Sequence, residues 1–123
     1  MRQSQIAFLH TSPAAIAPLA RYYATHEPEW LVTNLLDDGI LRLFRQADEG
    51  AVEAALGSLL RRAVEHYGVE AAMITCSAVS LGLLRRLEAG STVPLVKIDV
   101  PMMRAAVEQA ERIGVLVSFR PTI

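Results

Sequence analysis

The chain has 123 residues, 52% of them hydrophobic, which suits the core of one α/β domain and excludes two. Its formal net charge of −1, with scattered basic residues, gives no field for nucleic acid, so we expect no nucleic-acid partner. A single cysteine excludes an internal disulfide, and His10, His26 and His66 lack the spacing of metal ligands. We therefore expect no metal. No segment is apolar enough to span a membrane, so we expect a cytoplasmic protein.

The first third of the chain predicts two strands separated by a helix. Residues 6–9 form a short apolar run, and Ser12 followed by Pro13 is typical of an N-cap and the first helical position. A second apolar run covers residues 31–36. It ends at the turn signal of residues 37–39, and a short helix is expected after it.

The middle of the chain continues this alternation. Apolar residues recur at helical spacing over 49–67, and Gly68 marks the end of that helix. Residues 71–75 predict a buried strand, 79–87 a helix and 93–98 another strand.

The last part of the chain predicts one more helix and one more strand. Asp99 and Pro101 indicate the start of a helix in which Met102 and Met103 are expected in the core, and residues 114–117 predict a last strand. Strands that alternate with helices predict a Rossmann-like, three-layer αβα lobe with about four to five parallel strands and right-handed crossovers.

The final segment repeats the pattern of the first one. Residues 113–122 and 6–13 both contain an apolar run, a hydroxyl residue and a proline. We therefore expect a first lobe over residues 1–112 and the start of a second, truncated lobe over 113–123.

Polar side chains follow the predicted strands, whose carboxyl ends should meet at one edge of the sheet. Ligands of open α/β sheets bind at such an edge. The hydroxyls expected to contact a small anionic ligand there are those of Thr11, Ser12, Thr75 and Ser77. For Ser12 and Ser77, helix N-capping is the alternative, and Asp37 and Asp38, at the end of another strand, are more simply turn residues.

The only cysteine, Cys76, lies where a predicted strand ends and a helical pattern begins. Backbone N–H groups at a helix N-terminus favour the thiolate, so a reactive thiol is one interpretation. A buried thiol acting as a small apolar side chain is the other. His10 could pair with Cys76 as in thiol hydrolases, or it could be a neutral hydrogen-bonding residue.

Four segments together resemble the N-terminal half of the aspartate/glutamate/hydantoin racemase superfamily. They are Leu35–Asp38, Ile74–Ala78, Val96–Asp99 with Pro101 and Met102, and Ile113–Leu116. The resemblance spans nearly the whole chain, and the Thr-Cys-Ser-Ala element is its most specific part. The glycine-rich first loop of the amino-acid racemases is missing here.

The resemblance implies a cofactor-independent enzyme that acts at the α-carbon of a small carboxylate such as aspartate, glutamate or a hydantoin. Members have two pseudo-symmetric lobes, each with a cysteine that acts as acid or base. By that resemblance Cys76 is the first-lobe cysteine, and Thr11, Ser12, Thr75 and Ser77 are substrate contacts.

This chain lacks the opposing cysteine, so racemisation by it alone is not expected, and isomerisation or decarboxylation are related possibilities. A non-catalytic domain that binds a small anion or forms oligomers is the alternative function. In either case, a lobe with an uncovered apolar face is expected to form a homo-oligomer.

Overall fold

The computed structural model describes residues 2–123, which contain a four-stranded, fully parallel sheet. Its strands are β1 (Gln5–His10), β2 (Leu31–Leu36), β3 (Ala71–Ile74) and β4 (Leu95–Lys97). The order across the sheet is β2-β1-β3-β4, so β1 lies between β2 and β3. The predicted parallel α/β lobe is confirmed, with four strands.

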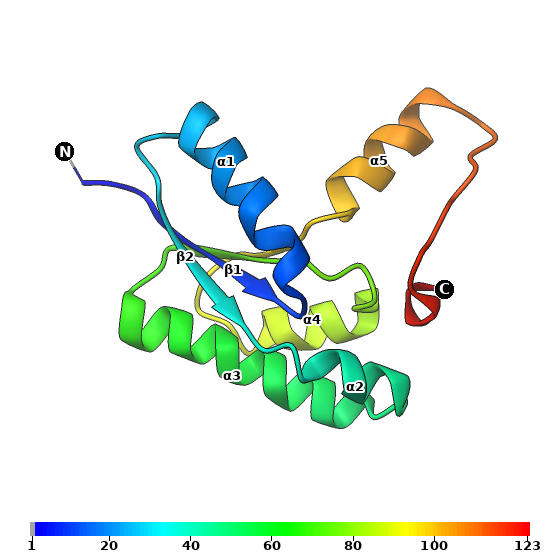
Figure 1. The fold of residues 1–123 in the computed structure, drawn as a ribbon, viewed down its shortest axis with the longest axis horizontal. Coiled ribbons are helices and arrows are strands. Elements are labelled where there is room, and N and C mark those ends of the chain that lie inside the picture. Colours follow the sequence, from blue (N-terminus) through cyan, green and yellow to red (C-terminus); the bar gives the residue numbers. More distant parts are fainter. Residues whose placement is uncertain (1) are drawn as a thin grey trace.

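Helices alternate with the strands along the chain. They are η1 (Pro13–Ala15), α1 (Ile16–His26), α2 (Ile40–Arg45), α3 (Glu49–Tyr67), α4 (Leu81–Ala89), α5 (Val100–Gln109) and η2 (Arg120–Thr122). In Figure 1, α3 and α4 cover one face of the sheet and α1 covers the other. The sheet is therefore the middle layer of three.

Helix α3 has the bounds that its sequence predicts, because both of its ends are capped. The side chain of Asp48 accepts a hydrogen bond from the backbone N–H of Ala51 at 3.0 Å. At the other end, Gly68 adopts a left-handed conformation with φ of +62°, which glycine reaches without a steric penalty.

The core lies between the sheet and helices α3 and α4. Alternate residues of a strand point to opposite faces, so one face of the sheet receives Ala7, Leu9, Ala72 and Ile74. These side chains pack in one cluster with buried residues of both helices: Val52, Leu56, Leu60, Ala63, Leu83, Leu84 and Leu87. The opposite face carries Phe8.

Two expectations for the last third of the chain are wrong. Residues 114–117 form no strand, and Leu116 is fully exposed, because these residues pair with none of the four strands among residues 2–123. Met102 and Met103 are not core residues, since 62% and 37% of their surface is exposed. Helix α5 has no buried residue at all, so a helical apolar pattern here does not indicate burial.

Within residues 2–123, none of the helices combines the length and apolar content that crossing a lipid bilayer requires.

Candidate functional site

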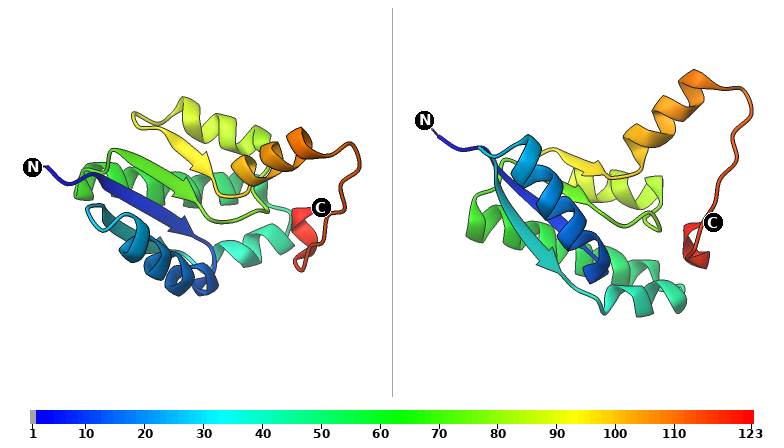
Figure 2. Two further views of the ribbon diagram at one scale, coloured as in Figure 1. Left: turned by 90° about the horizontal axis from the view of Figure 1, so that it is seen from above. Right: turned by 45° about the horizontal axis from the view of Figure 1, so that its top comes forward.

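The carboxyl ends of the parallel strands meet at one edge of the sheet, as the sequence predicts (Figure 2). Backbone hydrogen bonds continue beyond the strands there: Thr75 N–H donates to Leu9 O at 3.1 Å, and Asp37 N–H donates to His10 O at 3.1 Å. The chain leaves β1 toward β2, while β3 lies on the other side of β1. This is a topological switch point, the place where open α/β sheets bind their ligands.

His10, the last residue of β1, is completely buried and forms a hydrogen-bonded network across three strands. Its Nε2 lies 2.8 Å from Asn34 Oδ1, and its Nδ1 lies 2.7 Å from Thr75 Oγ1. A carbonyl oxygen can only accept, so Nε2 carries a proton. In a neutral imidazole Nδ1 then accepts the hydroxyl proton of Thr75.

This network commits the Thr75 hydroxyl to the interior. Its oxygen also lies 3.3 Å from Leu9 O, a longer contact than the 2.7 Å contact with His10. The Thr75 hydroxyl is within donating distance of both His10 Nδ1 and Leu9 O, and both of these atoms lie inside the fold. Thr75 therefore joins strands, and its proton is not directed at a ligand.

Cys76 lies on the opposite side of the strand from this network. It is 8% exposed and belongs to the core cluster, where it continues the side-chain direction of Ile74. Both ring nitrogens of His10 already have other partners. The structure therefore does not pair His10 with Cys76, and His10 is a hydrogen-bonding residue.

The helix after Cys76 begins later than predicted. Ser80, and not Ser77, is its N-cap: the Ser80 hydroxyl accepts a hydrogen bond from Leu83 N–H at 3.1 Å, and α4 begins at Leu81. The effect of a helix dipole falls off within the first turn. The predicted stabilisation of a Cys76 thiolate by this helix is therefore not supported.

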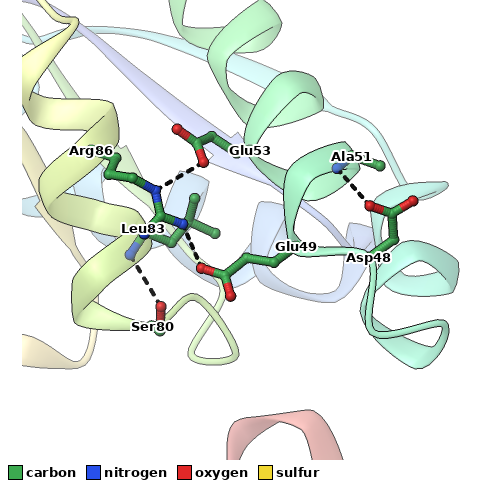
Figure 3. A network of polar contacts seen from close by, with 7 residues as sticks. All are labelled: Asp48, Glu49, Ala51, Glu53, Ser80, Leu83 and Arg86. Carbon is green, nitrogen blue, oxygen red and sulfur yellow. Dashed lines mark hydrogen bonds and ion pairs between the residues drawn. The ribbon is translucent and has the colours of Figure 1, made fainter.

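An ion-pair clamp fixes α4 against α3 (Figure 3). Arg86 donates from Nε to Glu53 at 2.9 Å and from a terminal nitrogen to Glu49. The hydrogen bonds that Arg86 donates to Glu49 and Glu53 raise the pKa of Arg86. Ser80 caps the same helix, so the loop after Cys76 ends at Ser80.

The remaining predicted site residues have different surroundings. Thr11 is 3% exposed, and the Ser12 hydroxyl accepts a hydrogen bond from Ala14 N–H at 3.3 Å, so N-capping describes Ser12. Asp37 Oδ1 accepts from Gly39 N–H at 3.0 Å, which makes Asp37 a turn residue. Ser77 is exposed. Thus Thr11, Ser12, Thr75 and Ser77 share the edge, and Ser77 is the one of these four that is exposed.

The end of the chain returns to this same edge (Figure 1). Thr122 Oγ1 lies 3.3 Å from Ser77 Oγ, and the guanidinium of Arg45 lies 5.6 Å from the centre of the Phe119 ring. Pro121 borders a hollow that is also lined by Ala78. The segment 119–122 therefore lies next to the loop that carries Cys76.

Sequence reasoning missed a buried charge at the end of β4. The side chain of Lys97 is 8% exposed, and its Nζ lies 3.2 Å from Asp99 Oδ2. Asp99 Oδ1 is buried and has no hydrogen-bond partner among residues 2–123. A lysine inside the otherwise apolar run 93–98 is the signal that could have shown this pair.

Over the part of the chain that the structure describes, no group of three or more His, Cys, Asp or Glu residues is arranged to hold a metal ion. The fold and its switch point define the protein as a parallel α/β lobe of open-sheet type. Comparisons with models of protein families, with curated proteins and with solved structures gave no match for the chain.

Proposed function

We propose that this chain is the N-terminal lobe of a cofactor-independent racemase- or isomerase-like enzyme that acts at the α-carbon of a small carboxylate in the cytoplasm. Aspartate, glutamate and hydantoins are the substrates that the sequence resemblance favours. The observation that carries the proposal is the position of Cys76, the only thiol of the chain, at the switch-point edge, two residues after the end of β3. Sγ of Cys76 is the acid/base group in this proposal.

The proposed step is a proton transfer, in which no atom changes its oxidation state and no oxidant or reductant is needed. The Cys76 thiolate accepts the α-proton, and the electron pair of the C–H bond moves to the α-carbon and into the substrate carboxylate. The thiol then returns a proton to the same face. Inversion requires an acid on the opposite face, and the chain has no second cysteine to provide it. Exchange with retention of configuration is therefore the activity expected of this chain.

Substrate binding in this proposal involves the loop after β1. This loop begins at the carboxyl end of β1, at the same edge of the sheet as the residues after β3. Backbone N–H groups at the start of a helix bind carboxylates. The loop, and Ser77 across the edge, are the groups we assign to the substrate carboxylate.

A second candidate is a non-catalytic domain that binds a small anion or forms oligomers. Two observations favour it: Cys76 is only 8% exposed, and the hydroxyls of Ser12 and Thr75 already serve the fold. This candidate needs no access of a substrate to the thiol. The two candidates therefore differ in whether the native protein exposes Cys76 to a small reagent.

Deuterium exchange tests the catalytic proposal. The chain is incubated in D2O with L-aspartate, L-glutamate or a 5-substituted hydantoin, and the α-proton signal is followed by NMR while a chiral separation measures inversion. We expect loss of the α-proton signal without inversion, and no loss with Cys76→Ala. Ser58→Ala, on α3 and away from the edge, is the matched surface control. Exchange that survives in Cys76→Ala would falsify the assignment of Cys76.

Alkylation by iodoacetamide separates the two candidates. If Cys76 acts on substrates, the native protein is labelled at neutral pH at a rate within about tenfold of the urea-unfolded chain. Labelling that occurs only after unfolding identifies a buried core thiol and supports the non-catalytic domain.

A further inference from the structure

A groove of about 890 Å³ lies at the free edge of the sheet, where β4 has no neighbour beyond it among residues 2–123. Helices α4 and α5 form its walls, and α5 stands away from the sheet (Figures 1 and 2). Apolar side chains line it and remain exposed: Val96 is 43% exposed, Met103 37% and Val107 65%. Apolar surface of this kind marks an interaction site.

The same groove carries a charge pattern that the chain itself does not satisfy. Arg85 and Glu88 line it from α4, and Arg104 and Glu108 line it from α5. None of these four is in an ion pair within residues 2–123, whereas Arg86, on the side of α4 toward α3, pairs with two glutamates.

On both helices the arginine precedes the glutamate. This order is the less favourable one for a pair inside a helix, because the helix dipole prefers the acid nearer the N-terminus. The charges therefore contribute little to the stability of their own helices. Their signs balance, which excludes a polyanion such as nucleic acid as the occupant.

We propose that a second copy of this chain occupies the groove, across a two-fold axis that sets the two α5 helices antiparallel. A two-fold axis reverses the order of charges, so Arg104 of one copy faces Glu108 of the other, and the reverse pair forms as well. Val107 of each copy then lies between these pairs, and Met103 lies one residue before Arg104 on the same stretch of α5. The order arginine, apolar residue, glutamate along α5 is complementary to itself when the two α5 helices are antiparallel. If the two helices were parallel, like charges would face each other.

Charge reversal tests this surface. The dimerisation constant of the 123-residue chain is measured by sedimentation velocity for the wild type, Arg104→Glu, Glu108→Arg and the double variant. Each single variant places like charges opposite each other twice, so we expect dimerisation to weaken at least tenfold. The double variant restores opposite charges, and we expect it to dimerise within threefold of the wild type.

Two controls separate this surface from other outcomes. Arg62→Glu makes the same charge change on the exposed side of α3, and dimerisation should be unaffected; far-UV circular dichroism verifies that every variant is folded. Val107→Asp should weaken dimerisation without unfolding α5, because Val107 is exposed. A wild-type monomer at 1 mM, a dimer insensitive to the single variants, or a double variant as weak as the singles would each overturn the proposal.

Discussion

The two faces of the sheet are covered very differently. On one face, α3 contributes four buried residues and α4 contributes three, and all of them pack against the strands. On the other face, α1 contributes no fully buried residue, although Phe8 of β1 packs against Tyr23 of α1 with ring centres 5.0 Å apart. One face is a closed apolar core, and the other is a thinner layer.

Because the two faces are covered differently, the apolar core lies on one face of the sheet and a buried hydrogen-bonded network lies on the other. The buried His10 network lies on the strand side away from α3, where hydrogen bonds take the place of apolar packing. Burial raises the pKa of Tyr23 on the same side, and the neighbouring Tyr22 and Glu27 raise it further. Cys76 lies on the closed side. The candidate site is therefore the place where the two environments meet, at the carboxyl edge.

The largest expected effect is the difference in stability loss between a Leu→Ala substitution on one face of the sheet and the same substitution on the other face. Leu56→Ala on α3 removes a fully buried side chain, and we expect the free energy of unfolding to fall by about 3–4 kcal/mol. Leu19→Ala on α1 removes a half-buried side chain and should cost about 1 kcal/mol. Urea denaturation measures both. Equal losses would mean that α1 closes its face as tightly as α3 does.

A second substitution tests whether hydrogen bonds stabilise the thinner side. His10→Leu leaves Asn34 Oδ1 without its partner and leaves Thr75 Oγ1 with only its longer contact to Leu9 O, and we expect a loss of about 2 kcal/mol in the free energy of unfolding. His26→Leu is the matched control, because His26 is exposed and bonds only to a backbone carbonyl. Its effect should stay within about 0.5 kcal/mol. If the two variants lose equal stability, the network has no role beyond that of a surface histidine.

The smallest expected effect concerns the start of α4 on the closed side. Ser80→Ala removes the N-cap and should cost about 1 kcal/mol, measured by urea denaturation. Ser77→Ala, three residues earlier, caps nothing and should change stability by less than about 0.5 kcal/mol. If Ser77→Ala loses more stability than Ser80→Ala, Ser77 is the N-cap and the helix begins near residue 79, as the sequence pattern predicts.

Local signals were sufficient to predict most elements of this fold. Helix α3 has a periodic apolar stripe with an acidic cap before it and a glycine after it, and its predicted and observed bounds agree. The four strands of the sheet were predicted for the same reason, since each is a short apolar run followed by a turn or a cap. The convergence of the strand ends follows from parallel pairing, which alternation of strands and helices implies.

The errors share a different physical origin. Residues 114–117 have the composition of a strand, but a strand requires a neighbouring edge, which the local sequence does not report. The same applies to Met102 and Met103, whose burial depends on what α5 packs against. The roles of His10 and Thr75 depended on which side chains face one another across strands, and single-sequence patterns contain no such information.

The hydrogen bond between His10 and Thr75 joins residues that are 65 positions apart in the chain. Between them lie η1, α1, β2, α2 and α3, so the pairing of β1 with β3 closes a long segment of the chain. Closing so long a segment costs conformational entropy, which only the long-range strand contacts offset. A partial unfolding that separates β1 from β3 abolishes the candidate site even while α3 remains helical, so the site is present only in the fully folded chain.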